Sequence, residues 1–279
     1  MSELNRNGDP LVDGVQWTQL YKLGGWAALA AALLFRRNLA EEFLLLRLLG
    51  IIRSGPQAFP GNTVDWFILL GTHPLVGLTF LNLFDAVNYA LVGLIFLSLC
   101  PALFRINKSA MTLAMALTLV AVAVYAASNQ AFALLSLSGQ YAVAVTDAQR
   151  SGLLAAGQAL LAIHNSSANY GNGPYVSFLF VNLAGLIIAV VMLRSNVFGK
   201  FAAWMGILAN FFGLSYYLTL AFAPSMSVIS LSLSAPFLLI WYLVVGRRLL
   251  RLGHRERCQV VRLEFEVGND LVPPFPGLL

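Results

Sequence analysis

The sequence predicts an all-α integral membrane protein, a polytopic bundle of six membrane-spanning helices. Of its 279 residues, 59% are hydrophobic and only 10% are charged, whereas a soluble domain has roughly 25% charged residues on which its hydrated surface depends. Three stretches contain no Asp, Glu, Lys or Arg, namely residues 109–146, 151–193 and 201–246. Each exceeds the roughly 20 residues that cross a bilayer, and backbone in hydrocarbon must be helical to satisfy its hydrogen bonds.

The first two expected spans are separated by a segment of mixed character. Span one covers residues 17–35 and is followed by two arginines. Residues 39–52 combine leucines with charges, which predicts an amphipathic helix lying in the headgroup layer. The alternative is that part of this segment is embedded in the membrane, which changes the number of spans. Span two covers residues 74–104, and Pro74 suits the first turn of a helix.

Four further spans follow, separated by short polar connections. We expect span three at residues 109–135 and span four at 174–193, after a stretch rich in Asn and Gly. Span five covers residues 201–222. Pro224 then breaks the chain before span six, at residues 228–246.

The positive charges predict that both chain ends face the cytoplasm. The connections after spans two and four carry Arg105 with Lys108 and Arg194 with Lys200. The chain after span six carries a cluster of arginines: Arg247, Arg248, Arg251, Arg255 and Arg257. With six spans these three regions share one side of the membrane, which the positive-inside rule assigns to the cytoplasm.

Three regions are therefore expected in a multi-pass protein of the cell (plasma or inner) membrane. They are a cytoplasmic segment at residues 1–16, the six-helix domain at residues 17–246 and a basic cytoplasmic tail at residues 247–279. Arginines beside a membrane helix suit anionic lipid headgroups. We therefore expect the lipid bilayer, and not nucleic acid, to be the partner of the tail.

Two segments resemble a known family. Residues 138–162 (SGQYAVAVTDAQRSGLLAAGQALLA) and residues 192–208 (MLRSNVFGKFAAWMGIL) are similar to parts of a bacterial six-helix membrane family classified as a domain of unknown function, DUF 4386. A last helix with Pro236 and Trp241 also resembles that family. The resemblance covers most of residues 17–253 and implies six helices. The family supplies no activity, catalytic residue or cofactor to carry over.

Asp85 is the one acidic residue inside an expected span, and a carboxylate at membrane depth is costly enough to be a functional candidate. Asn82, Asp85 and Tyr89 share one face of a helix, and Asn88 lies at its edge. Other spans bring amides to a comparable depth: Asn129, Gln130, Asn182 and Asn210. These eight residues predict a ligand-binding pocket that opens away from the cytoplasm. In the structural alternative, they only hold helices together by hydrogen bonds.

Three classes of function stay open on the sequence. The protein binds or moves a small molecule or lipid in this pocket, or it is a non-catalytic subunit of a larger membrane complex. The third class is an intramembrane enzyme that uses Asp85 with His73 or His164. No motif identifies a catalytic residue, a metal site or a cofactor, so the first two classes are favoured over an enzyme. No inverted internal repeat singles out transport.

Overall fold

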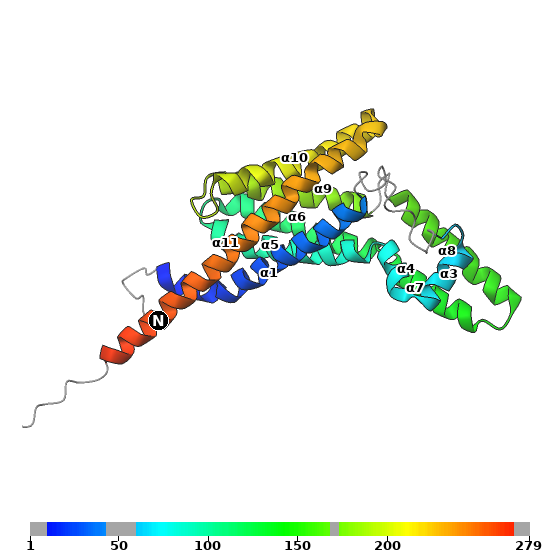
Figure 1. The fold of residues 1–279 in the computed structure, drawn as a ribbon, viewed down its shortest axis with the longest axis horizontal. Coiled ribbons are helices and arrows are strands. Elements are labelled where there is room, and N and C mark those ends of the chain that lie inside the picture. Colours follow the sequence, from blue (N-terminus) through cyan, green and yellow to red (C-terminus); the bar gives the residue numbers. More distant parts are fainter. Residues whose placement is uncertain (1–9, 43–59, 168–172, 271–279) are drawn as a thin grey trace, which may run out of the picture.

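The computed structural model describes residues 10–42, 60–167 and 173–270, and its regular structure is entirely helical in these ranges. It has two parts, a bundle of long helices and a cluster of shorter helices at one end of the bundle (Figure 1). The elements in chain order are α1 (Pro10–Glu42), α3 (Thr63–Thr72), α4 (Pro74–Phe80), α5 (Leu83–Phe104), α6 (Lys108–Ser128), α7 (Ala131–Val143), α8 (Asp147–Ser167), α9 (Gly173–Leu193), α10 (Lys200–Phe222), the short 3-10 helix η1 (Pro224–Met226) and α11 (Ser227–Asp270).

The bundle is a closed ring of long helices, each packed against two neighbours. The order around the ring is α1, α5, α6, α9, α10 and α11, and α11 packs against α1 to close it. Neighbouring helices run antiparallel (Figure 1). The large ring core includes Trp241 of α11, which is 1% exposed and meets Phe96 of α5 edge-on, with 6.0 Å between ring centroids.

Small side chains and hydroxyl groups bring the ring helices close together. Gly24 of α1 lies against Ser98 of α5, and the Ser98 hydroxyl donates to the carbonyl of Leu20 at 2.8 Å. On the other side of the ring, Ser234 of α11 donates to the carbonyl of Ala209 in α10, also at 2.8 Å. Close packing and hydrogen bonds of this kind hold membrane helices together, because lipid tails are as apolar as the helices themselves.

Five stretches of the described chain are long and apolar enough to cross a membrane: Leu83–Phe104, Lys108–Val143, Gly173–Leu193, Lys200–Phe222 and Pro224–His254. They overlap predicted spans two to six, so the prediction of a multi-pass membrane protein is confirmed at this level. Predicted span one lies in α1, which completes the ring but is not among the five. Polar residues such as Gln19 and Lys22 lower the hydropathy of this helix, and a sixth span stays a prediction.

Predicted span two consists of two helices in the structure. α4 and α5 are separated at Leu81 and Asn82, and Asn82 has a positive φ of 63°. Asn adopts this left-handed conformation more readily than most residues, because its short side chain can hydrogen-bond locally. α5 alone has 22 residues, which corresponds to about 33 Å and is enough to cross the hydrocarbon core.

Predicted span three also divides into two helices. The apolar stretch Lys108–Val143 has 36 residues, and one straight helix of that length would measure about 54 Å, far more than the roughly 30 Å of hydrocarbon. Asn129 ends α6 with extended backbone (φ −74°, ψ 119°), and its side-chain oxygen accepts from the N–H of Ala131 at 2.9 Å, where α7 begins. α7 therefore leaves the bundle and joins the cluster of shorter helices.

Helices α3, α4, α7 and α8 form this cluster, which we call the four-helix module. It lies at the opposite end of the bundle from the α5–α6 and α9–α10 links (Figure 1), the end that the predicted topology places outside the cytoplasm. The module has a small apolar core of its own: Trp66, Phe67, Leu69, Leu70, Leu78, Leu81, Ala131, Leu134 and Leu161. In α8, Gly157 allows close contact with Thr63 and Phe67 of α3.

No helix is predicted from the sequence in the region of α8, although the start of this helix carries a capping signal. The Thr146 hydroxyl accepts from the N–H of Gln149 at 3.2 Å, and the Gln149 side-chain oxygen accepts from the N–H of Thr146 at 3.3 Å. This reciprocal pair is a capping box, which satisfies two backbone donors at the start of a helix.

The last helix is much longer than predicted span six. α11 has 44 residues and continues past Gly246 to Asp270, so helix extends through most of the basic tail. The predicted interfacial helix at residues 39–52 falls largely outside the described residues, and only its first four residues belong to the last turn of α1.

Candidate functional site

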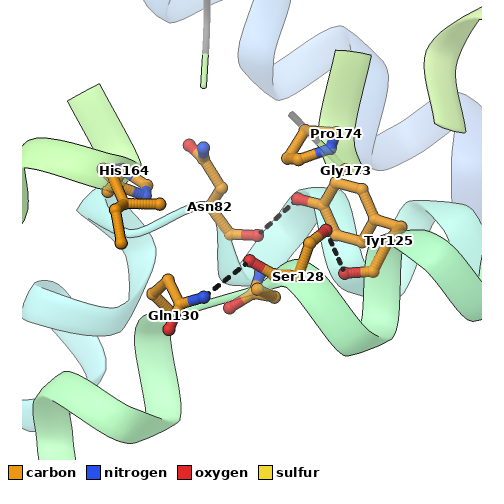
Figure 2. A pocket seen from close by; sticks show the side chains of 9 residues that line it. Asn82, Tyr125, Ser128, Gln130, His164, Gly173 and Pro174 are labelled. Carbon is orange, nitrogen blue, oxygen red and sulfur yellow. Dashed lines mark hydrogen bonds between the residues drawn. The ribbon is translucent and has the colours of Figure 1, made fainter. Parts of the chain in front are cut away.

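A polar pocket lies where the bundle meets the four-helix module. Its volume is about 170 Å³. The lining comes from helix ends and breaks: the α4–α5 break, the end of α6 with the α6–α7 break, the end of α8 and the start of α9 (Figure 2). The described lining residues are Asn82, Tyr125, Ser128, Asn129, Gln130, Ile163, His164, Gly173 and Pro174.

Asn82 contributes both its backbone and its side chain. Its carbonyl oxygen accepts a hydrogen bond from the Tyr125 hydroxyl at 3.4 Å, which links the start of α5 to the end of α6. The side-chain amide is exposed and points away from that bond (Figure 2). The left-handed backbone of Asn82 thus ends one helix, starts the next and presents an amide to the pocket.

Three consecutive polar residues at the end of α6 form another wall of the pocket. The Ser128 hydroxyl donates to the carbonyl of Val124 at 2.7 Å. The Gln130 side-chain amide donates to the carbonyl of Ser128 at 3.3 Å (Figure 2), and the Asn129 oxygen caps α7. Since Asn129 and Gln130 also break the helix, the turn itself places these polar groups at the pocket.

The remaining wall comes from α8 and α9. Gly173 lies so close to the Ser128 hydroxyl that a methyl group in its place would overlap it, and Pro174 follows in the first turn of α9. His164 of α8 is partly buried, and this burial lowers the pKa of His164 below its ordinary value of 6.5. The imidazole is therefore neutral at pH 7, because burial disfavours the charged form.

Asp85, Asn88 and Tyr89 lie on α5 beside the pocket and do not line it. The ring of Tyr89 stacks on that of Tyr125, with 4.1 Å between centroids and 17° between planes. Asp85 is partly buried and lies within electrostatic range of both tyrosine hydroxyls. The buried side-chain oxygen of Asn88 has no hydrogen-bond partner among the described residues. Asp85 and Tyr89 are therefore next to the pocket, with Tyr125 between them and the cavity.

Asn182 and Asn210 lie elsewhere, in the interface between α9 and α10. Asn182 is 6% exposed and lies against Gly213, while Asn210 is 4% exposed and lies against Gly185. Each amide donates to a carbonyl of its own helix at 2.7 Å, from Asn182 to Phe178 and from Asn210 to Gly206. The two side chains therefore contact the neighbouring helix by packing, while these hydrogen bonds stay within their own helices.

The structure thus brings together three of the eight predicted site residues, Asn82, Asn129 and Gln130. Sequence reasoning did not include Tyr125, Ser128, Gly173 or Pro174. One signal was available for Ser128, which begins a run of three polar residues directly after an apolar span. No sequence pattern indicates that the start of α9 meets the end of α6.

A second hollow, of about 420 Å³, lies on the surface of the module at the α7–α8 turn. It is shallower than the pocket, and its described lining contains no aromatic or ionisable side chain: Gln140, Val143, Ala144, Ala148, Gln149, Gly152 and Leu153. The smaller pocket, which gathers more polar groups from distant segments, is the better candidate for a specific ligand.

No family model, curated protein or solved structure matches the chain. Within the described residues, no three His, Cys, Asp or Glu side chains gather as a metal site would require. The chemistry that the pocket offers is hydrogen bonding, from amides, hydroxyls and a neutral imidazole beside one aromatic ring.

Proposed function

We propose that this multi-pass membrane protein binds a small molecule in the pocket between the bundle and the four-helix module. The single observation that carries the proposal is the convergence of polar side chains from three separate segments on one cavity, with the start of α9 as a fourth wall. Helix-to-helix hydrogen bonding does not require a cavity, whereas Asn82 and Gln130 line a cavity of about 170 Å³. Concave sites with a few convergent polar groups are where proteins bind small ligands.

We also propose the membrane orientation and the family that the sequence predicts. The four-helix module and its pocket face the outside of the cell, and both chain ends face the cytoplasm of a bacterium. Arg105, Lys108, Arg194 and Lys200 support this orientation, because they flank the two links at the other end of the bundle. Membership of the DUF 4386 family agrees with a ring of six helices and implies no particular activity.

Native mass spectrometry of the protein, extracted gently from its own membrane, tests the proposal. The expected result is a small molecule or lipid bound at fixed stoichiometry to the wild type and lost from Gln130→Leu. The matched control is Gln140→Leu, at an exposed position in α7, the helix that directly follows Gln130. Gln140 lines the second hollow and not the pocket, so this variant should keep the added mass. A bare protein, or a small molecule that Gln130→Leu retains, would overturn the proposal. Stoichiometric added polypeptide in place of a small molecule would instead identify an accessory subunit of a membrane complex.

A further inference from the structure

The described lining of the pocket has no charged side chain, since it contains no Asp, Glu, Lys or Arg. Its titratable groups are the Tyr125 phenol and the His164 imidazole, and burial lowers the pKa of His164, so that this ring is neutral near pH 7. Asp85, the nearest acidic residue on α5, does not line the pocket. An anion would give up its hydration here without meeting a positive side chain of the described lining, and a cation would have the Asp85 carboxylate only behind Tyr125. Either loss of hydration is costly.

The pocket offers both hydrogen-bond donors and hydrogen-bond acceptors. The Asn82 amide is engaged by none of the described residues, and therefore supplies an N–H₂ group and an oxygen. Gln130 uses one N–H on the Ser128 carbonyl at 3.3 Å and has a second N–H and its oxygen left over. The Ser128 hydroxyl donates within α6 at 2.7 Å, so its oxygen can still accept. Hydroxyl and amide groups complement such a mixed set, because each donates and accepts at once.

The size and the apolar walls limit the ligand further. A cavity of about 150 Å³ can hold benzene, which has six non-hydrogen atoms, and this pocket is about 170 Å³. Ile163, Pro174 and the ring of Tyr125 supply an apolar side to the lining. The space therefore fits a compact molecule that has a short carbon skeleton with polar groups along it.

We propose that the ligand is an uncharged molecule of about six to eight non-hydrogen atoms that carries at least two hydroxyl or amide groups, such as a small polyol. This inference rests on the proposed function, since it names the ligand class of the same pocket. The terminal glycerol of a phospholipid headgroup has the same chemistry as a free polyol, so either source satisfies the pocket.

Three probes of nearly equal size separate the charge classes: glycerol, its anionic counterpart glycerate and its cationic counterpart 3-aminopropane-1,2-diol. Saturation-transfer NMR on the purified full chain, in a detergent free of glycerol groups, measures binding of each. The expected result is that glycerol binds at least tenfold more tightly than either charged probe. Binding should weaken at least tenfold in the double variant Asn82→Gly/Gln130→Leu and stay unchanged in Gln140→Leu.

Asn82→Gly suits this test because glycine keeps the left-handed backbone and removes only the amide. Tighter binding of a charged probe would overturn the ligand class and leave the proposed function standing. If none of the probes binds while native mass spectrometry still shows a small molecule that Gln130→Leu loses, the ligand class is again wrong and the pocket is right. If that added mass is missing too, the proposed function fails with it.

The same measurement in nanodiscs identifies the source of the polyol group. Competition of glycerol by phosphatidylglycerol, and not by phosphatidylcholine, would assign the pocket to a lipid headgroup. Glycerol binding that is equal in both lipids would assign it to a free solute. Either result supports recognition of an uncharged polyol group, and absence of glycerol binding in both lipids would overturn it.

Discussion

The side-chain oxygen of Asn182 in α9 lies against the Cα of Gly213 in α10, and the side chain of Asn210 in α10 lies in the same way against Gly185 in α9. Each helix therefore has an Asn followed three residues later by a Gly. Because α9 and α10 are antiparallel, the Asn of each helix lies against the Gly of the other. Each amide donates to its own helix, so its oxygen is directed at the opposing backbone. The pair fixes both the separation and the register of α9 and α10.

Replacing Gly213 with Ala should destabilise the ring, because the added methyl group overlaps the Asn182 amide. Overpacking of this kind costs about 1–3 kcal/mol. Thermal unfolding in detergent measures the loss. Gly139→Ala is the matched control, since Gly139 of α7 has open space around its Cα, and this change should not lower the unfolding temperature.

A double-mutant cycle tests whether the loss of stability in Gly213→Ala arises from contact with Asn182. Asn182→Ala removes the group that the new methyl would strike, so Gly213→Ala should cost less in the Asn182→Ala background than in the wild type. Strictly additive losses would show that the two residues do not interact.

Asn82 should respond differently to Gly and to Ala. The positive φ of 63° costs an ordinary L-residue about 1–2 kcal/mol and costs glycine little. Asn82→Ala is therefore expected to unfold at lower temperature than Asn82→Gly, in thermal scans without added ligand. Equal unfolding temperatures would argue against a left-handed residue between α4 and α5.

A substitution that pushes α8 away from α3 should destabilise the four-helix module and leave the stability of the bundle unchanged. In Gly157→Ala, the new methyl group would come within 2.6 Å of the Phe67 ring, and we expect a local loss of about 1–3 kcal/mol. Gly152→Ala, on the same helix but in open space, is the control. Hydrogen exchange should rise in α3 and α8 and stay unchanged in α9 and α10. Uniform exchange across both parts would mean that module and bundle unfold as one unit.

The stability of the protein should depend on pH through His164. Burial lowers the pKa of His164 from 6.5, so the unfolded chain binds a proton more readily than the folded one. The stability that the neutral ring contributes is complete above pH 6.5 and is lost as the pH falls through the folded pKa. Between pH 7.5 and pH 5, the unfolding temperature of His164→Gln should therefore fall by a few degrees less than that of the wild type. Parallel curves for the wild type and His164→Gln would contradict a buried, neutral imidazole at this site.

The apolar runs were sufficient to predict the membrane class and five of the long helices, because hydrocarbon leaves the backbone no alternative to helix. The breaks at Asn82 and Asn129 were not predicted. Hydropathy averages over about 19 residues, and a single left-handed or extended residue does not change that average. The length of the Lys108–Val143 stretch was the available sign, since 36 residues exceed one span.

The candidate site was predicted in part for the same reason. Asn82, Asn129 and Gln130 were selected as polar residues in apolar runs, and they line the pocket. Asn182 and Asn210 were selected by the same criterion but lie between two helices. Polarity and depth are properties of one helix, whereas a pocket depends on which helices are neighbours. That order follows from packing across the ring, which the hydropathy pattern does not contain.

The closure of the ring by α1 and α11 has a consequence for biosynthesis. α1 can complete its packing only after α11 has been synthesised, since Gly25 packs against Leu250 and Gly246 against Ala28. Until α11 is inserted, the faces of α1 and α10 that it covers in the complete ring are not packed against another helix. A nascent chain halted before α11 would therefore leave one side of the ring open.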